Sequence, residues 1–378
     1  MLLFVAFGVL AITKTFLYPE TAKQVFLDFK QVSFLGAIII TFDNIIAGIS
    51  TYYHERAAAA WAAYGMFWIA MTLTVTEGCV ALQVACCYQK PHRFSEVSGT
   101  WLLSFIPFIV TSSLGSTLIP HLNRTNQEIL LVVSFLSWSL GEILCSIIVA
   151  IYFWRLLSSS LPPRSSVISC FIPMGPFGLG AYAIQTLASS FSTYIKSTNF
   201  HLSPSSTSQI SPENLAAVAE TIEWISIMVA LAFVSFSTFW LIHATSAVIL
   251  RMPIQFNVGF WSCVFPLGVY TLAVERLAFN LNNAGFRGWA ATCCVVTVLL
   301  WLGCTCLTMW SAIWKGGLST VRRLESIGPE RHDTTKEREG EEEALEEGMV
   351  REFAESRETN PVERWRRGVV ALSDDRER

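Results

Sequence analysis

Long apolar stretches alternate with short polar connections over the first 314 residues of the chain. Each stretch is close to the ~20 residues that an α-helix needs to cross the hydrocarbon core of a bilayer. The pattern therefore predicts an all-α integral membrane protein. It would be a bundle of nine transmembrane helices over residues 1–18, 33–53, 59–85, 99–120, 128–154, 165–195, 215–250, 258–281 and 288–314.

Charge divides the chain into two parts. Residues 315–378 carry 30 charged side chains among 64 positions, whereas residues 1–314 carry 25. A soluble domain has about 25% charged residues, so the first part cannot form a water-facing surface. We expect a transmembrane domain over 1–314, in contact with the lipid bilayer, and a disordered cytoplasmic tail over 315–378. This composition excludes a cytosolic enzyme, a nucleic-acid-binding protein and a secreted disulfide scaffold.

The orientation in the membrane follows from the basic residues between segments. With the tail in the cytoplasm, seven Lys and Arg residues fall in the inner loops and four in the outer ones. Cytoplasmic loops are usually the more basic, so this orientation is favoured, and it leaves the N-terminus outside. The sequence leaves open whether the chain forms a homo-oligomer.

Neither a metal site nor an enzyme active site is indicated. The ten cysteines lie mostly within apolar runs and lack the paired spacing of zinc ligands. An intramembrane enzyme needs paired polar catalysts on facing helices, whereas the polar residues here are scattered singly. We expect no cofactor and no metal, and an enzyme remains the less favoured class.

Prolines inside the membrane occupy every other segment. Pro107, Pro173, Pro176 and Pro266 lie in segments 99–120, 165–195 and 258–281, and the segments between them contain none. A proline kinks a helix and frees a carbonyl group that lipid cannot satisfy. We therefore predict an inner ring of kinked helices around a central pore, enclosed by straight helices. The alternative is that proline is simply common in membrane helices.

Two motifs rich in glycine and proline are the strongest site candidates. In the first, Gly175, Pro176, Gly178 and Gly180 fall within eight residues. A helix that restarts near Phe177 would direct free N–H groups at an anion in mid-membrane. The alternative is that these glycines let helices pack closely.

The second motif is Phe265-Pro266-Leu267-Gly268. An aromatic ring beside a kink can close a narrow pore, so Phe265, Pro266 and Gly268 are candidates for the pathway. The alternative for Phe265 is a packing role.

Polar residues within the apolar segments complete the candidates. Ser112 and Ser113, which follow Pro107, could solvate an ion or bond back to their own helix. Charged residues at membrane depth are costly and call for a functional hypothesis. Arg276 and Glu142 are the foremost of these. Glu142 and Glu77 could carry protons or form hydrogen bonds between helices.

Several of these motifs resemble those of the tellurite-resistance/dicarboxylate transporter family, within the superfamily of voltage-dependent, slow-type anion channels. That family includes plant slow-type anion channels, fungal malic acid transporters and fungal sulfite efflux pumps. The likeness covers about residues 1–315 and is greatest to the sulfite efflux branch. It rests on Leu17-Tyr18-Pro19-Glu20, Val32-Ser33-Phe34-Leu35-Gly36, Leu161-Pro162-Pro163-Arg164 with the 173–180 motif, and residues 256–261 leading into 265–273.

The resemblance implies ten helices, five of them kinked around a central pore, with both termini in the cytoplasm and Phe265 as the occluding aromatic. The chain differs from the family in two ways. It begins at the family's second helix, so it is expected to lack the first, and it has Leu179 where the family usually has Gln.

Together these features predict sulfite efflux across the plasma membrane through a central pore. Transport of a C4-dicarboxylate such as malate is the alternative within the family, with Arg276 as the residue suited to a bulkier dianion. A truncated, non-transporting paralogue and a membrane scaffold for the charged tail are the remaining alternatives.

Overall fold

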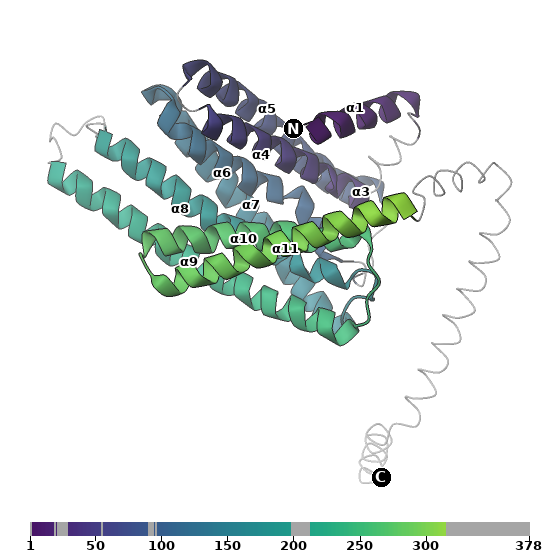
Figure 1. The fold of residues 1–378 in the computed structure, drawn as a ribbon. Helices are drawn as coiled ribbons and strands as arrows, with labels where there is room; N and C mark the ends of the chain where they lie inside the picture. Colours follow the sequence, from purple (N-terminus) through teal and green to yellow (C-terminus); the bar gives the residue numbers. More distant parts are fainter. Residues whose placement is uncertain are drawn as a thin grey trace, which may run out of the picture. The chain divides into compact units, whose positions relative to one another are not determined.

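The computed structural model describes residues 2–18, 20, 29–53, 56–89, 94, 97–197 and 212–314, so the charged tail lies outside the described residues. The described part is helical and contains no strand (Figure 1). Its α-helices are α1 (Leu2–Leu17), α3 (Phe29–Ser33), α4 (Leu35–Tyr52), α5 (Ala57–Gln83), α6 (Ile106–Leu118), α7 (Arg124–Ser159), α8 (Met174–Ser197), α9 (Pro212–Arg251), α10 (Trp261–Asn280) and α11 (Ala284–Trp314).

Shorter helical turns join or extend several of these helices. A π-helical turn, η1 (Val84–Tyr88), extends α5. The 3₁₀ turns are η3 (Gly99–Ser104), η4 (Ile119–His121), η5 (Val167–Phe171) and η6 (Val258–Phe260).

Seven helices of the described part are long and apolar enough to cross a membrane, with some spans including an adjoining turn. They are Gln31–Tyr52, Ala57–Tyr88, Arg124–Ser159, Val167–Ser197, Glu213–Arg251, Val258–Asn280 and Ala284–Ser311. The predicted helix over 99–120 is instead α6, with 13 residues, between the turns η3 and η4. The helix α1, with 16 residues, covers the predicted segment 1–18. The all-α membrane class is confirmed, and the number of nine spans stays a prediction.

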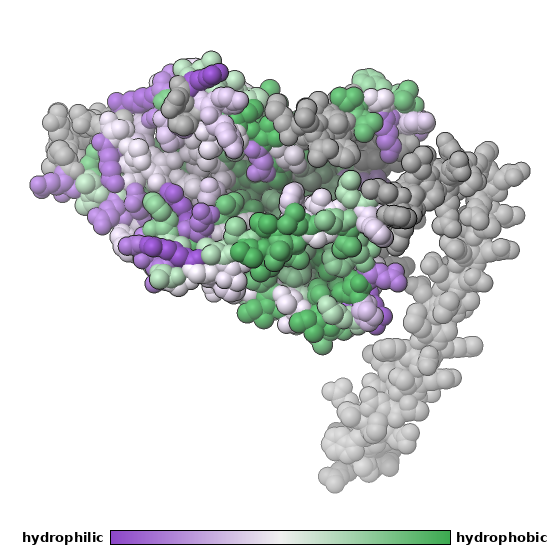
Figure 2. Space-filling model, in the orientation of Figure 1, coloured by the Kyte–Doolittle hydropathy of each residue, from purple (hydrophilic) through white to green (hydrophobic). Residues whose placement is uncertain are grey.

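The spans differ in how deeply they are buried. In the most apolar window of each span, 78% of Val167–Ser197 is buried inside the protein, against 17% of Ala284–Ser311. In the short helix α6, 12 of the 13 residues are buried. Figure 2 shows apolar side chains gathered over α11, while polar ones gather near the ends of α8 and α9 at the left of the view. The described helices thus include buried members, α6 and α8, and members such as α11 that present apolar side chains outward.

The prolines mark helix starts as well as a kink. Pro107 stands in the first turn of α6, and Pro173 separates η5 from α8. Pro266 alone among these lies inside a helix, α10. A proline in the first turn costs no hydrogen bond because the N–H there has no partner within the helix. All of these prolines are buried, so the breaks face the protein interior and not lipid.

Aromatic side chains hold the outer helix α9 against the inner helix α8 and against α7. The Phe177 ring meets Phe236 edge-on with centroids 4.6 Å apart, and it meets Phe233 at 5.8 Å. Trp240 in α9 is fully buried and stacks on Tyr152 of α7 at 5.9 Å. Such pairs add about 0.5–1.5 kcal/mol beyond the area that they bury.

Candidate functional site

A cavity of about 470 Å³ lies where α4 meets the first turns of α10. Four parts of the chain far apart in sequence form its walls. They are α4, the turn η3, the segment from Ser165 to Ile172 that includes η5, and the η6 turn with the start of α10.

The wall of this cavity is mostly apolar, its polar groups are chiefly hydroxyls and backbone, and no charged side chain is among the described residues that line it. Hydroxyls solvate an ion without fixing an opposite charge beside it. The hydroxyl-bearing side chains are Thr41, Thr100, Ser165, Ser166, Ser169 and Ser262.

Phe265 and Pro266 are the last residues of α10 that line the cavity. The kink brings Pro266 against the first turn of α8. A methyl group placed on Gly175 would lie 3.6 Å from Pro266 Cβ and Cγ. The two motifs identified from the sequence therefore meet in space, on α8 and α10.

Beyond Pro266, α8 and α10 pack closely together. A methyl group on Gly178 would lie only 3.0 Å from Tyr270 Cα. On another face of α8, a methyl group on Gly180 would lie 1.8 Å from Glu142 Oε1 of α7. Glu142 is thus a buried carboxyl group behind α8. Gly175, Pro176, Gly178, Gly180 and Gly268 do not line the cavity, and close packing accounts for Gly178 and Gly180.

The start of α8 differs from the expected restart near Phe177. The helix begins three residues earlier, at Met174, because η5 leads into it through a continuous turn. The Gly175 N–H donates to Ile172 O at 2.9 Å, and Pro173 and Pro176 have no N–H. The first turn of α8 therefore offers an anion fewer free donors than an ordinary helix start. Its nearest residues in the cavity wall are Ser169 and Ile172.

The hydroxyls of α6 lie outside the cavity wall. Thr111 donates to Asp43 Oδ2 at 2.8 Å, and the Ser116 hydroxyl lies 2.7 Å from Ser113 O and 2.9 Å from Thr186 Oγ1, with one hydrogen to share between them. The Ser112 hydroxyl is fully buried without a hydrogen-bond partner. Pro107 packs against α4, where a methyl group on Gly36 would lie 3.2 Å from its ring.

Arg276 lies ten residues beyond Pro266 on α10, a distance of about 15 Å along the helix. Its guanidinium lies over the Phe279 ring, 5.5 Å from the centroid. Its neighbour Glu275 lines a second cavity of about 430 Å³ together with Arg287. Arg276 is therefore separated from the cavity at Phe265.

Three arginines lie close to the segments that form the wall of the cavity at Phe265. Arg251, in the last turn of α9, donates to Leu161 O at 2.8 Å, and Arg155 donates to Ser160 O at 3.1 Å. Arg164 directly precedes Ser165 in the cavity wall. These cations lie near the lining segments and not within the wall itself.

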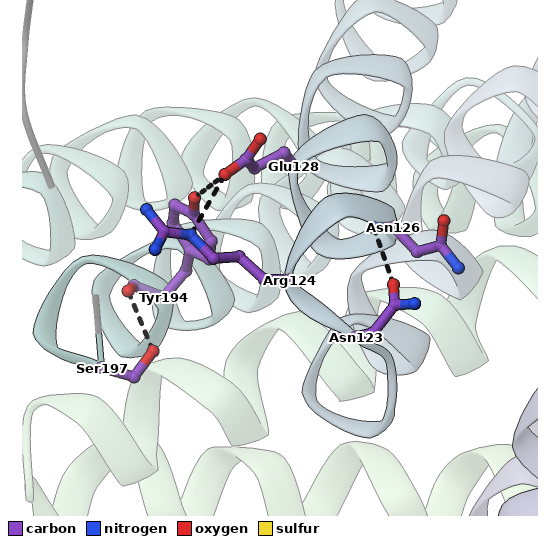
Figure 3. Close-up of polar contacts among 6 residues, drawn as sticks. All are labelled: Asn123, Arg124, Asn126, Glu128, Tyr194 and Ser197. Carbon is purple, nitrogen blue, oxygen red and sulfur yellow. Dashed lines mark hydrogen bonds and ion pairs between the residues drawn. The ribbon is translucent and has the colours of Figure 1, made fainter. Parts of the chain in front are cut away.

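The opposite end of α8 carries a different polar cluster (Figure 3). Arg124 lies 3.5 Å from Glu128 Oε1, which also accepts a hydrogen bond from the Tyr194 hydroxyl. Asn123 caps α7 by accepting from Asn126 N at 3.1 Å. An exposed ion pair of this kind contributes roughly 0–1 kcal/mol. The cluster joins α7 to α8, and within it Arg124 is paired with Glu128.

A third, almost entirely apolar groove of about 520 Å³ lies between α7, α8 and α9. Ser226 is the one polar residue among the described residues that line it. A groove of this composition suits hydrocarbon and offers an anion no solvation.

The sequence identified Phe265 and Pro266 but not the hydroxyls around them. Thr41, Thr100, Ser169 and Ser262 come from separate segments, and each is an ordinary residue in its own segment. Thr41, Ser169 and Ser262 donate to Ala37 O, Ser166 O and Gly259 O of their own segments, as helical hydroxyls commonly do, so no local spacing distinguishes them. Only their convergence in the folded chain marks them.

The described part of the chain is thus a multi-pass helical membrane protein with breaks in buried helices and a cavity that carries hydroxyls and no charged side chain, an architecture that suits transport. Residues 1–309 match the voltage-dependent anion channel family. The chain belongs to this family.

Curated relatives cover most of the chain. It is 24% identical over 320 residues to the sulfite efflux pump SSU1 of Arthroderma otae, across 83% of this chain and 81% of the relative. It is 26% identical over 328 residues to the protein of the same name from Trichophyton rubrum, with the same coverage of the two chains. A more distant relative is an uncharacterized transporter of Methanocaldococcus jannaschii, 21% identical over 192 residues, which are 50% of this chain and 48% of that one.

Proposed function

We propose that this protein moves sulfite out of the cell across the plasma membrane. The observation that carries the proposal is the cavity at Phe265, whose mostly apolar wall carries six hydroxyl side chains and no charged side chain among its described lining residues. The names of the SSU1 relatives support sulfite as the anion. The chain thereby functions as an anion-transport domain over residues 1–314.

A wall of hydroxyls suits transport because an anion must leave as readily as it enters. A fixed cation in the wall would hold the anion, whereas hydroxyl and backbone dipoles bind it weakly. Ser169 and Ser262 place such hydroxyls in the wall from two different segments, with their hydrogens bonded to Ser166 O and Gly259 O. The pathway from this cavity continues along α10 past Phe265.

The orientation supports export. Arg155, Arg164 and Arg251 lie at the end of the helices that carries the cavity, and basic residues favour the cytoplasmic side. A positive rim also raises the local concentration of anions. Sulfite would therefore enter the cavity from the cytoplasm, and the tail that follows α11 would lie on the same side.

Phe265 is the gate in this proposal. Its ring lines the cavity beside the kink at Pro266, where α10 meets Gly175 of α8. Because a ring can rotate without displacing the backbone, Phe265 can open or close the end of the cavity while α8 and α10 stay packed.

Malate is the second candidate substrate. A dicarboxylate would favour a site with a cation that can pair with it. Arg276 is an arginine within a membrane-spanning segment, on the same helix as Phe265. Its separation from the cavity at Phe265 favours the smaller anion.

The test is transport by the purified full chain in liposomes. Vesicles loaded with radiolabelled sulfite or malate are diluted into anion-free buffer at alkaline pH, where sulfite carries two charges. We expect protein-dependent loss of sulfite well above that of malate, relative to protein-free vesicles. Faster malate loss would replace sulfite by a dicarboxylate, and no flux of either would contradict transport. Deletion of 315–378 should leave the flux unchanged, and a loss of flux would implicate the tail.

A further inference from the structure

Two carboxyl groups lie buried between α4, α5 and α6, on the side of α4 away from the cavity. Asp43 is 1% exposed and Glu77 is 7% exposed. Neither lines any of the three cavities described above. The cavity takes Ala37, Ile40 and Thr41 from α4, whereas Gly36 lies against η3 and α6, and Asp43 lies against Thr111 of α6.

Asp43 is the end of a directed chain of hydrogen bonds. Thr111 donates to Asp43 Oδ2 at 2.8 Å, and the Thr74 and Thr111 hydroxyl oxygens lie 3.1 Å apart. A hydroxyl has one hydrogen. Because Thr111 donates its hydrogen to Asp43, the hydrogen bond between the two threonines must be donated by Thr74. The other oxygen, Asp43 Oδ1, is buried and has no hydrogen-bond partner.

Glu77 lies one helical turn beyond Thr74 on α5, and neither of its oxygens has a hydrogen-bond partner. The Ser104 hydroxyl lies near this carboxyl group. Ser104 gives its hydrogen to Ser33 at 2.9 Å, and Ser33 gives its own to Phe29 O. The single hydrogen of Ser104 is therefore engaged by Ser33, which leaves the buried Glu77 carboxyl group without a hydrogen-bond partner.

No neighbouring cation compensates these carboxyl groups in the described part of the chain. Asp43 and Glu77 themselves are the ionisable groups that α4 and α5 direct inward, and α6 and η3 contain none. Of Lys30 in α3 the structure describes only the backbone. Beyond α6, α7 contributes Glu142, which lies against Gly180 of α8. An isolated charge in such surroundings costs far more than a neutral acid.

We propose that Asp43 and Glu77 form a proton-binding site inside the membrane, separate from the anion cavity, whose occupancy controls anion flux. The threonine pair Thr74 and Thr111 links α5 to Asp43, and Glu77 lies one helical turn beyond Thr74 on α5. A proton suits the site better than a metal cation does. A proton needs no cavity, and the Thr74 and Thr111 hydroxyls beside Asp43 are already hydrogen-bonded at 2.8–3.1 Å. The proton comes from water and returns to it, and no other bond changes. The control of flux rests on the transport function proposed above.

The first test measures the protons directly and does not depend on transport. Infrared difference spectra of the purified full chain are recorded against pH, and the C=O stretch of protonated carboxylic acids is followed. We expect Asp43→Asn and Glu77→Gln each to remove part of the band. Glu142→Gln should remove a different component and leave these two. A carboxylic-acid band that is the same in wild-type protein and in both single variants would overturn the proposed site, even if transport itself were never observed.

The second test measures sulfite flux in liposomes over a range of pH. The charge of sulfite also changes with pH, but it does so equally for every variant, so the ratio of variant to wild-type flux isolates the protein. The doubly neutral variant Asp43→Asn/Glu77→Gln should show a several-fold change in this ratio over the range. Thr76→Val, on the exposed face of α5 beside Glu77, should keep the ratio constant.

A constant ratio for the double variant would overturn the control of flux. Absence of sulfite flux in wild-type protein would instead contradict the proposed function, and the infrared result would still decide the site.

Discussion

Gly178 of α8 lies directly against the backbone of Tyr270 in α10. A methyl group on Gly178 would stand 3.0 Å from Tyr270 Cα and 3.1 Å from its nitrogen. Four residues earlier on α10, Pro266 lies against Gly175 of α8, where a methyl group would stand 3.6 Å from its ring. The glycines thus let two broken helices approach closely, which positions Phe265 at the end of the cavity.

This contact predicts a graded response to alanine substitution in α8. Gly178→Ala should destabilise the protein by about 1–3 kcal/mol because backbone cannot move aside as a side chain can. Gly175→Ala should be tolerated, since its new methyl group would make ordinary contacts. The measurement is the melting temperature of purified protein in detergent. Gly65→Ala, at an exposed position with nothing within 4 Å, is the control. Equal melting temperatures for Gly175→Ala and Gly178→Ala would contradict the contact.

Gly180 and Glu142 should be coupled. Gly180→Ala places a methyl group 1.8 Å from Glu142 Oε1 and should lower the melting temperature. Glu142→Ala removes the clashing carboxyl group, so the double variant should be more stable than the sum of the two single effects predicts. Neighbouring residues typically show coupling of about 0.5–3 kcal/mol. Strict additivity would show that the two groups do not meet.

Replacing the gate residue should raise transport. Phe265→Ala removes the ring at the end of the cavity, and a barrier lower by ~1.4 kcal/mol gives about tenfold faster sulfite flux. Flux through liposomes is the measurement, with protein content normalised. Leu272→Ala, on an exposed face of the same helix, should leave flux near the wild-type value. Unchanged or lower flux in Phe265→Ala, with normal incorporation, would assign the ring to packing.

A negative charge in the cavity wall should block anions. Ser262→Asp adds a carboxylate to a wall that has no charged side chain among its described residues, and the repulsion of two like charges at close range amounts to several kcal/mol. Sulfite flux should fall by more than about tenfold. The neutral variant Ser262→Asn has nearly the same size and should retain most of the flux. If both variants transport equally well, the anion does not pass this wall.

The Tyr270 hydroxyl joins three helices and should stabilise their arrangement. It accepts from Trp289 Nε1 at 2.9 Å and lies 2.8 Å from Thr238 Oγ1, linking α10 to α11 and α9. Tyr270→Phe leaves the indole N–H without this acceptor and should cost about 1 kcal/mol. Thermal melting in detergent measures the loss, with Tyr52→Phe, at a residue 86% exposed, as the matched control. A melting temperature equal to that of wild type would contradict the bridging role.

The sequence by itself determined the membrane class and the positions of the helix breaks. Apolar length and the scarcity of charge are local properties, and proline removes a backbone donor in whatever fold it stands. For that reason Pro107, Pro173 and Pro266 could be recognised as breaks before any contact was known. Their exact form, a 3₁₀ turn before α6 and α8 but a kink within α10, depended on how the chain enters each helix.

Only the tertiary structure decided which polar groups act together. Thr41, Ser169 and Ser262 lie on separate segments, and so do Asp43 and Thr111, so their meeting depends on helix packing and not on spacing along the chain. The same packing separated Arg276 from the cavity and placed Gly178 against Tyr270. Composition fixes what a segment can bury, but a site is a set of distances between segments, and those distances exist only once the helices have packed.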